Sequence, residues 1–144
     1  MRKYLIIILV AGCLQAGAQS KKTVQAMANS KLLVSTIFET RDSATLEKLF
    51  APNMTHLNGA GTQETRSEAI RNIIHNPSKY VQATMTNGYG VSSHGDSTTV
   101  KFFYKGREYK ADGSSVPFAV NLEMVWVKIK KNTTLYSLHT VKAE

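Results

Sequence analysis

The stretch VPFAVNLEMVWVKIK, residues 116–130, decides the fold class of this chain. Its many β-branched and aromatic residues are typical of a strand. Successive side chains of a strand point to opposite faces, so one face carries large apolar groups, namely Phe118, Val120, Leu122, Met124 and Trp126. The other face mixes apolar and polar groups, namely Ala119, Asn121, Glu123, Val125 and Val127. We expect the first face to pack against helices and the second to be partly covered by a second subunit.

Further strands are predicted on both sides of this stretch, and helices precede them. The strand-like segments are residues 80–86, 89–93, 97–109 and 134–141, separated by turn-forming residues. Upstream, apolar residues at steps of three and four predict a helix over residues 24–41. Shorter helices are expected at residues 44–50, capped by Asp42 or Ser43, and at residues 68–75, capped by Ser67. Between them, residues 54–58 are strand-like and lead into the turn Asn58-Gly59-Ala60-Gly61. Helices first and antiparallel strands afterwards indicate an α+β fold with the helices on one face of the sheet.

The N-terminus has the pattern of a secretory leader. Met1-Arg2-Lys3 supplies a basic start, and the apolar segment after it is too short to span a membrane. Small residues at Ala16-Gly17-Ala18 predict a signal peptide of residues 1–18, a tether of residues 19–23 and a domain of residues 24–144. Alternatively, Val10-Ala11-Gly12-Cys13 resembles a lipobox, in which Cys13 carries a lipid anchor. Cys13 is the only cysteine, so no internal disulfide is expected.

Composition and charge exclude several classes of function. The chain has 144 residues, 42% of them hydrophobic, which is ordinary for one globular domain. Its formal charge is +8, and Arg2 and Lys3 of the leader account for two of these charges. The remaining basic residues are scattered rather than gathered on one face, so we expect a solvated surface and no nucleic-acid partner. The four histidines lack the short spacing of metal ligands, and no glycine loop for phosphates is present, so no metal or cofactor is expected.

The order of elements and several short motifs together resemble the nuclear-transport-factor-2-like superfamily, and within it the SnoaL-like exported bacterial proteins of unassigned function. The segments that carry the resemblance are Arg41-Asp42, Leu46 to Ala51, Thr55 to Gly59, Glu64 to Ile70, Met124 to Lys128 and the closing strand to Thr140. The match covers residues 24–142. The resemblance implies a cone-shaped roll, in which about three helices pack on a strongly curved, mainly antiparallel sheet with a cavity open at one end. Members of the superfamily include ketosteroid isomerases, dehydratases, ligand-binding proteins and interaction modules.

Two polar residues on the strand before the glycine turn are candidates for the site. His56 and Asn58 are two residues apart and therefore point to the same face. The ordinary pKa of histidine lies close enough to neutral for His56 to act as acid or base, although a buried, hydrogen-bonded histidine is an equal alternative. Asn58 stands where ketosteroid isomerases carry a general-base aspartate, and an amide cannot accept that proton. Asn58 either orients a ligand or serves the turn before Gly59.

Three later residues complete the candidate site. Trp126 and Tyr80 are expected to form an aromatic wall, with plain core packing as the alternative for each. His139, on the last strand with Leu135, Ser137 and Val141, is expected to reach the same cavity, with a half-exposed strand position as the alternative.

From the sequence, the leading hypothesis is a periplasmic or secreted domain that binds a small molecule in an apolar cavity and forms a homodimer. A dehydratase or isomerase that uses His56 as acid or base is the second hypothesis. A dimeric scaffold without catalysis is the third. The sequence leaves the ligand unidentified and leaves open whether the protein is an enzyme.

Overall fold

A computed structural model of the chain describes residues 20–143, with side chains for all of these except residues 82–88. The expected signal peptide and Cys13 lie outside the described residues. Within residues 20–143, none of the helices combines the length and the apolar character needed to cross a membrane.

The helical part consists of α1 (Lys21–Ser35), the π-helix η1 (Thr36–Thr40), α2 (Ser43–Leu49) and α3 (Arg66–His75). Helix α1 begins earlier than expected because the Ser20 side chain accepts a hydrogen bond from the Thr23 backbone N–H, so residues 21–23 form its first turn instead of a tether. Helix α3 is capped by Thr65 rather than Ser67. Thr65 and Glu68 form a capping box, in which each side chain accepts from the backbone N–H of the other.

Within residues 20–143, six strands form one sheet in the order β2-β1-β6-β5-β4-β3. Their bounds are β1 (Phe50–Leu57), β2 (Gln63–Thr65), β3 (Lys79–His94), β4 (Ser97–Tyr109), β5 (Ser115–Ile129) and β6 (Asn132–Lys142). All neighbours pair antiparallel except β1 and β6, which are parallel. The two strands expected at residues 80–86 and 89–93 are one strand, β3, interrupted by two register shifts against β4.

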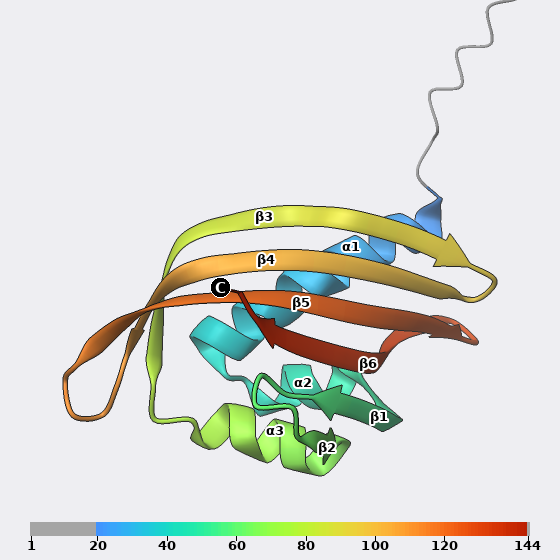
Figure 1. Cartoon of the computed structure of the whole chain (residues 1–144). Helices are drawn as coiled ribbons and strands as arrows, with labels where there is room; N and C mark the ends of the chain where they lie inside the picture. The colour runs from blue at the N-terminus through green and yellow to red at the C-terminus, as the bar shows by residue number, and fades with distance from the viewer. Residues whose placement is uncertain (1–19, 144) are drawn as a thin grey trace, which may run out of the picture.

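The long strands β3, β4 and β5 arch over α1, and α2 and α3 lie below with β1 and β2 (Figure 1). The expected α+β cone, with helices packed on a strongly curved and mainly antiparallel sheet, is confirmed. Its core contains the inward face of β5 as predicted, because Val120, Leu122, Met124 and Trp126 are all buried.

An irregularity in β6 determines which of its side chains face inward. Val125 of β5 pairs with Ser137 and Trp126 pairs with Leu135, so Tyr136 is an extra residue without a partner of its own. The buried residues Leu135 and Leu138 are therefore three positions apart instead of two. Beyond this bulge, the even-numbered residues of β6 point toward the helices.

Arg41 connects the end of η1 to the loop after α3. Its backbone φ of 53° lies in the left-handed region and ends the helix. The Arg41 guanidinium donates to the backbone carbonyls of Asn76 and Ser78. These contacts hold the segment that leads into β3 and Tyr80 close to η1 and Phe38.

Candidate functional site

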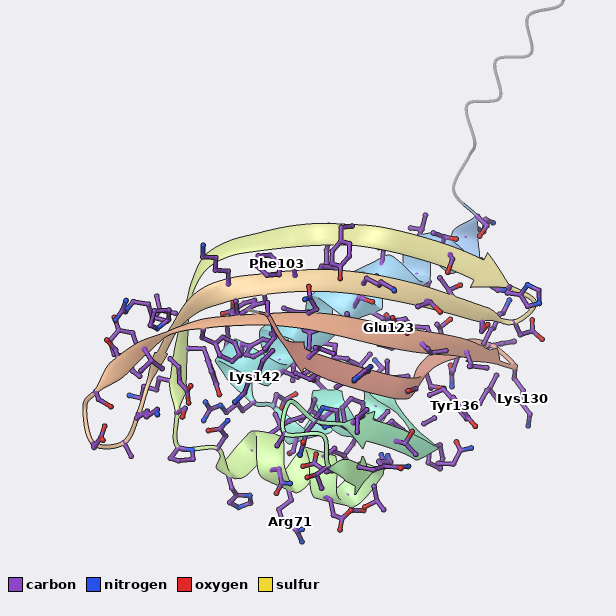
Figure 2. All side chains as sticks on the ribbon, viewed as in Figure 1. Arg71, Phe103, Glu123, Lys130, Tyr136 and Lys142 are labelled. Atoms are coloured by element: carbon purple, nitrogen blue, oxygen red, sulfur yellow. The ribbon has the colours of Figure 1, made fainter. Side chains whose placement is uncertain are left out.

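A cavity of about 240 Å³ lies between η1, α3 and the inner face of the sheet. Its apolar lining comes from Ile37, Phe38, Ile73, Tyr80, Phe118, Val120, Leu122 and Leu138. Its polar lining comes from His56, Asn58, Gly59, Glu64, Asn72, Asn76, Thr140 and Lys142. Lys142, labelled in Figure 2, extends from the end of β6 on the side of the sheet that carries α3. An apolar cavity with a few polar groups on one side is the usual form of a small-molecule site.

A chain of three side chains forms the centre of the polar lining. His56 Nδ1 lies 2.9 Å from Glu64 Oε2, and His56 Nε2 lies 3.0 Å from Thr140 Oγ1. The three residues come from β1, β2 and β6, three neighbouring strands of the sheet. His56 is only 8% exposed, so its two hydrogen bonds are shielded from competing water.

Two asparagine side chains hold Glu64 in place. Asn58 Nδ2 and Asn72 Nδ2 donate to Glu64 Oε1 over 2.8 and 2.9 Å. Burial alone raises the pKa of the Glu64 carboxyl, but the hydrogen bonds from Asn58, Asn72 and His56 outweigh burial and leave this pKa below its ordinary value. Glu64 is therefore a carboxylate at neutral pH.

The Glu64 carboxylate determines the tautomer of His56. Burial lowers the pKa of His56, and it outweighs the opposing effect of Glu64, so the ring is neutral at pH 7. A carboxylate only accepts hydrogen bonds, so the single ring proton is on Nδ1 and points to Glu64. Nε2 is then unprotonated and accepts the hydroxyl proton of Thr140. An imidazole oriented in this way has its basic nitrogen on the Thr140 side.

An aromatic wall forms the apolar part of the cavity. The Phe38 ring lies 5.2 Å from Tyr80 and 5.6 Å from Phe118, and Tyr80 lies 4.8 Å from Phe118, all measured between ring centroids. Tyr104 stacks on the Phe38 ring at 4.2 Å. Contacts of this kind keep the rings in fixed orientations, so the wall retains its shape without a ligand.

No protein-family model matches the sequence, and no curated protein matches it. Solved structures do match. A ketosteroid isomerase-like protein from Erwinia carotovora atroseptica aligns with a TM-score of 0.76 and 11% identity over 87% of this chain and 98% of its own. An NTF2-like superfamily protein from Salmonella enterica aligns with a TM-score of 0.73 and 14% identity over 88% and 94%. The fold is NTF2-like. The association domain of C. elegans CaMKII shares the fold at a TM-score of 0.60 and 16% identity, over 83% and 94% of the two chains.

Proteins with an NTF2-like fold thus include isomerase-like and association domains, and fold alone does not choose between functions.

Three of the five residues expected at the site line the cavity of this NTF2-like fold. His56, Asn58 and Tyr80 all belong to its lining. Asn58 combines both roles that the sequence left open, because its Oδ1 accepts from the backbone N–H groups of Ala60 and Thr62 in the turn while its Nδ2 holds Glu64.

Trp126 and His139 lie outside the cavity. Trp126 is 1% exposed in the core, where its Nε1–H donates to Ser30 Oγ over 2.7 Å. It lies on the same strand face as Phe118 but eight residues further along, roughly 26 Å away at 3.3 Å per residue, so Phe118 takes the expected place in the aromatic wall. His139 misses the cavity because the bulge at Tyr136 turns Leu138 and Thr140 inward instead.

Sequence reasoning missed Glu64 and Thr140. Glu64 lies on β2, a three-residue strand too short for its composition to identify. The turn sequence could have indicated Glu64, because a hairpin centred on Ala60 places residue 64 opposite residue 56. The structure has this pairing. Thr140 faces the cavity only because of the bulge in β6, and no turn-forming residue in the sequence indicates that bulge.

A larger hollow of about 680 Å³ runs along β1, β2 and the start of α3. Most of its polar lining residues, including Thr55, Gln63 and Ser67, are exposed to solvent. The smaller cavity is the better candidate site because its polar lining includes the buried His56, and because His56, Glu64 and Thr140 are hydrogen-bonded to one another.

Proposed function

We propose that this protein binds a small, largely apolar molecule in the cavity lined by His56. The observation that carries the proposal is the hydrogen-bonded chain Glu64–His56–Thr140, with the buried His56 at its centre, which borders a cavity that has an apolar and aromatic wall. Burying polar groups is costly unless they are hydrogen-bonded, and here the hydrogen bonds that satisfy them also fix one geometry next to the cavity. Such a surface is prepared to recognise one polar group on an apolar ligand.

The size of the cavity limits the ligand. A volume of about 240 Å³ corresponds to roughly eight water molecules at about 30 Å³ each. A single six-membered ring with one or two substituents fits this space, whereas a steroid-sized molecule requires the cavity to open.

Toluene is a suitable first probe. Titration of the methyl-labelled protein is expected to shift the NMR signals of Ile37, Val120 and Leu138, which line the cavity. Ile73→Trp, which places a larger side chain into the cavity from α3, is expected to abolish these shifts. Val24→Trp is the matched control, because Val24 is 51% exposed on α1. Shifts that are absent, or that are spread evenly over the surface, would refute the proposal.

Acid–base catalysis by His56, as in a dehydratase or isomerase, is the second candidate function. The specific observation in its favour is that the neutral imidazole, oriented by a carboxylate, borders the cavity. In that case turnover of a substrate that fits the cavity depends on the ionisation of His56, and His56→Ala abolishes it while the protein still folds. Binding that persists in His56→Ala without any turnover by the wild type supports the binding function instead.

We also propose that the chain is exported to the periplasm or secreted, on the evidence of its leader pattern. The mass of the purified mature protein distinguishes the two alternatives for processing. A chain that begins at Gln19 agrees with cleavage after Ala18, and a lipid-modified terminus at Cys13 contradicts it.

The outer face of the sheet supports a further proposal, that the protein forms a homodimer. Tyr89, Tyr136 and Val141 are 58%, 46% and 43% exposed, and Phe103, Glu123 and Tyr136 are labelled on the sheet in Figure 2. Exposed apolar side chains on one face are typical of an association surface. Sedimentation as a monomer at high concentration contradicts the homodimer, and with it the alternative of a dimeric scaffold.

A further inference from the structure

The polar centre of the cavity offers one hydrogen-bond acceptor to a ligand, the Thr140 oxygen. Both oxygens of Glu64 are already occupied, Oε2 by His56 and Oε1 by Asn58 and Asn72. The Nδ1 proton of His56 points to Glu64, and the Thr140 hydroxyl donates its only proton to Nε2. Thr140 lines the cavity, and its oxygen is left with a free lone pair and no proton to give.

The direction of this hydrogen-bond chain is fixed at its Glu64 end by two asparagine side chains. Asn58 and Asn72 stabilise the charge on Glu64, the charge places the ring proton on Nδ1, and the unprotonated Nε2 then orients the Thr140 hydroxyl. If Thr140 turned its proton toward a ligand, His56 Nε2 would lose its hydrogen-bond donor, and water has little access to replace it because His56 is 8% exposed. Leaving a buried polar atom unpaired is costly, so the chain resists reversal.

We propose that Thr140 selects ligands that carry a neutral hydrogen-bond donor, an alcohol or a phenol, over ketones of the same shape. This inference rests on the proposed function, because it assigns the ligand class of the same cavity. A ligand hydroxyl donates a hydrogen bond to the free lone pair of Thr140 Oγ1. A carbonyl oxygen in the same position faces a lone pair instead of a proton.

Charges of both signs line the cavity, so an ionised ligand of either sign meets a like charge there. The Glu64 carboxylate also lines the cavity and disfavours a second carboxylate there. The Lys142 side chain lines the same cavity and disfavours an ammonium group. A neutral hydroxyl is the donor that avoids both repulsions.

Cyclohexanol and cyclohexanone are the probes, because they have nearly the same volume and differ in the polarity of one group. Both dissociation constants are to be measured by methyl NMR titration at about pH 8, above the ordinary pKa of histidine. In the wild type, cyclohexanol is expected to bind at least about tenfold more tightly than cyclohexanone, since a mismatched buried hydrogen bond typically costs that factor or more.

Three variants test whether Thr140 is responsible. Thr140→Val removes the oxygen at nearly constant shape and is expected to bring the two dissociation constants within about threefold of each other. Thr140→Ser keeps the hydroxyl and is expected to keep the preference, which leaves the test decisive even if the valine variant folds poorly. Tyr136→Phe removes a hydroxyl from the exposed side of the same strand and is expected to change neither constant.

The outcomes separate this inference from the proposed function. Equal binding of the two probes to the wild type overturns the selection of donors while the binding function stands. A preference for cyclohexanol that survives in Thr140→Val also overturns the role of Thr140. No binding of cyclohexanol, cyclohexanone or toluene overturns the proposed function itself.

Discussion

Replacing Glu64 by glutamine is expected to reverse the hydrogen-bond chain of the cavity. In Glu64→Gln, the two asparagine donors hold the side-chain oxygen where Oε1 lies now. The amide NH₂ then faces His56 Nδ1 and requires an acceptor there, so the ring proton moves to Nε2. Nε2–H donates to Thr140, and the Thr140 hydroxyl proton becomes free to point into the cavity. The preference for cyclohexanol should therefore change to a preference for cyclohexanone.

The same substitution should lower stability by a moderate amount. Three hydrogen bonds end on the Glu64 carboxylate. Each loses about 1 kcal/mol when a charged acceptor becomes neutral, a total of about 3 kcal/mol. A neutral glutamine also avoids the desolvation cost of the Glu64 carboxylate, which offsets part of this loss. We therefore expect Glu64→Gln to reduce the free energy of unfolding by about 1–3 kcal/mol.

Urea unfolding and the two probe titrations are the assays, and Glu123→Gln is the matched control. Glu123 is an exposed carboxylate that pairs with Lys101 on the outer face over 2.9 Å. An exposed pair contributes at most about 1 kcal/mol, and its loss should leave both dissociation constants unchanged. A preference for cyclohexanol that persists in Glu64→Gln, or a stability equal to that of Glu123→Gln, contradicts the reversal of the hydrogen-bond chain.

Three further predictions concern stability. Burial lowers the pKa of His56, so the unfolded chain binds a proton at this histidine more readily than the folded protein does. The free energy of unfolding should therefore fall as the pH drops below about 6.5, by up to about 1.4 kcal/mol per pH unit. Urea titrations across this pH range should show the slope in the wild type and not in His56→Gln. Trp126→Phe leaves the buried Ser30 hydroxyl without its donor and should cost about 1–3 kcal/mol by the same assay, whereas a cost below the error of the assay contradicts that bond. Thr65→Ala removes the cap of α3 and should lower stability by about 1 kcal/mol, and an unchanged melting temperature argues against the capping box with Glu68.

The sequence predicted the fold class because long periodic segments carry strong signals. The alternation along residues 116–130 placed Val120, Leu122, Met124 and Trp126 on the buried face, where the structure has them. The parallel pairing of β1 with β6 was not predictable in the same way. It joins segments about 80 residues apart along the chain, and no local pattern encodes such a pairing.

The candidate site was predicted only in part, for reasons that lie in local backbone geometry. His56 and Asn58 follow from simple alternation on one strand, and the structure brings both to the cavity. His139 was expected there by the same alternation, but one extra residue at Tyr136 shifts every later side chain of β6 to the opposite face. Glu64, the carboxylate that orients His56, lies on a strand of three residues, and only its pairing with the neighbouring strand places it beside His56.

The direction of the hydrogen-bond chain Glu64–His56–Thr140 can be observed from the protonation of the two His56 ring nitrogens, with and without cyclohexanol. A long-range ¹H–¹⁵N spectrum at about pH 8 should show a protonated Nδ1 and an unprotonated Nε2, and cyclohexanol should shift the Nε2 signal through Thr140. A proton on Nε2, or ring signals that do not respond to cyclohexanol at any concentration, would contradict a ligand site at Thr140.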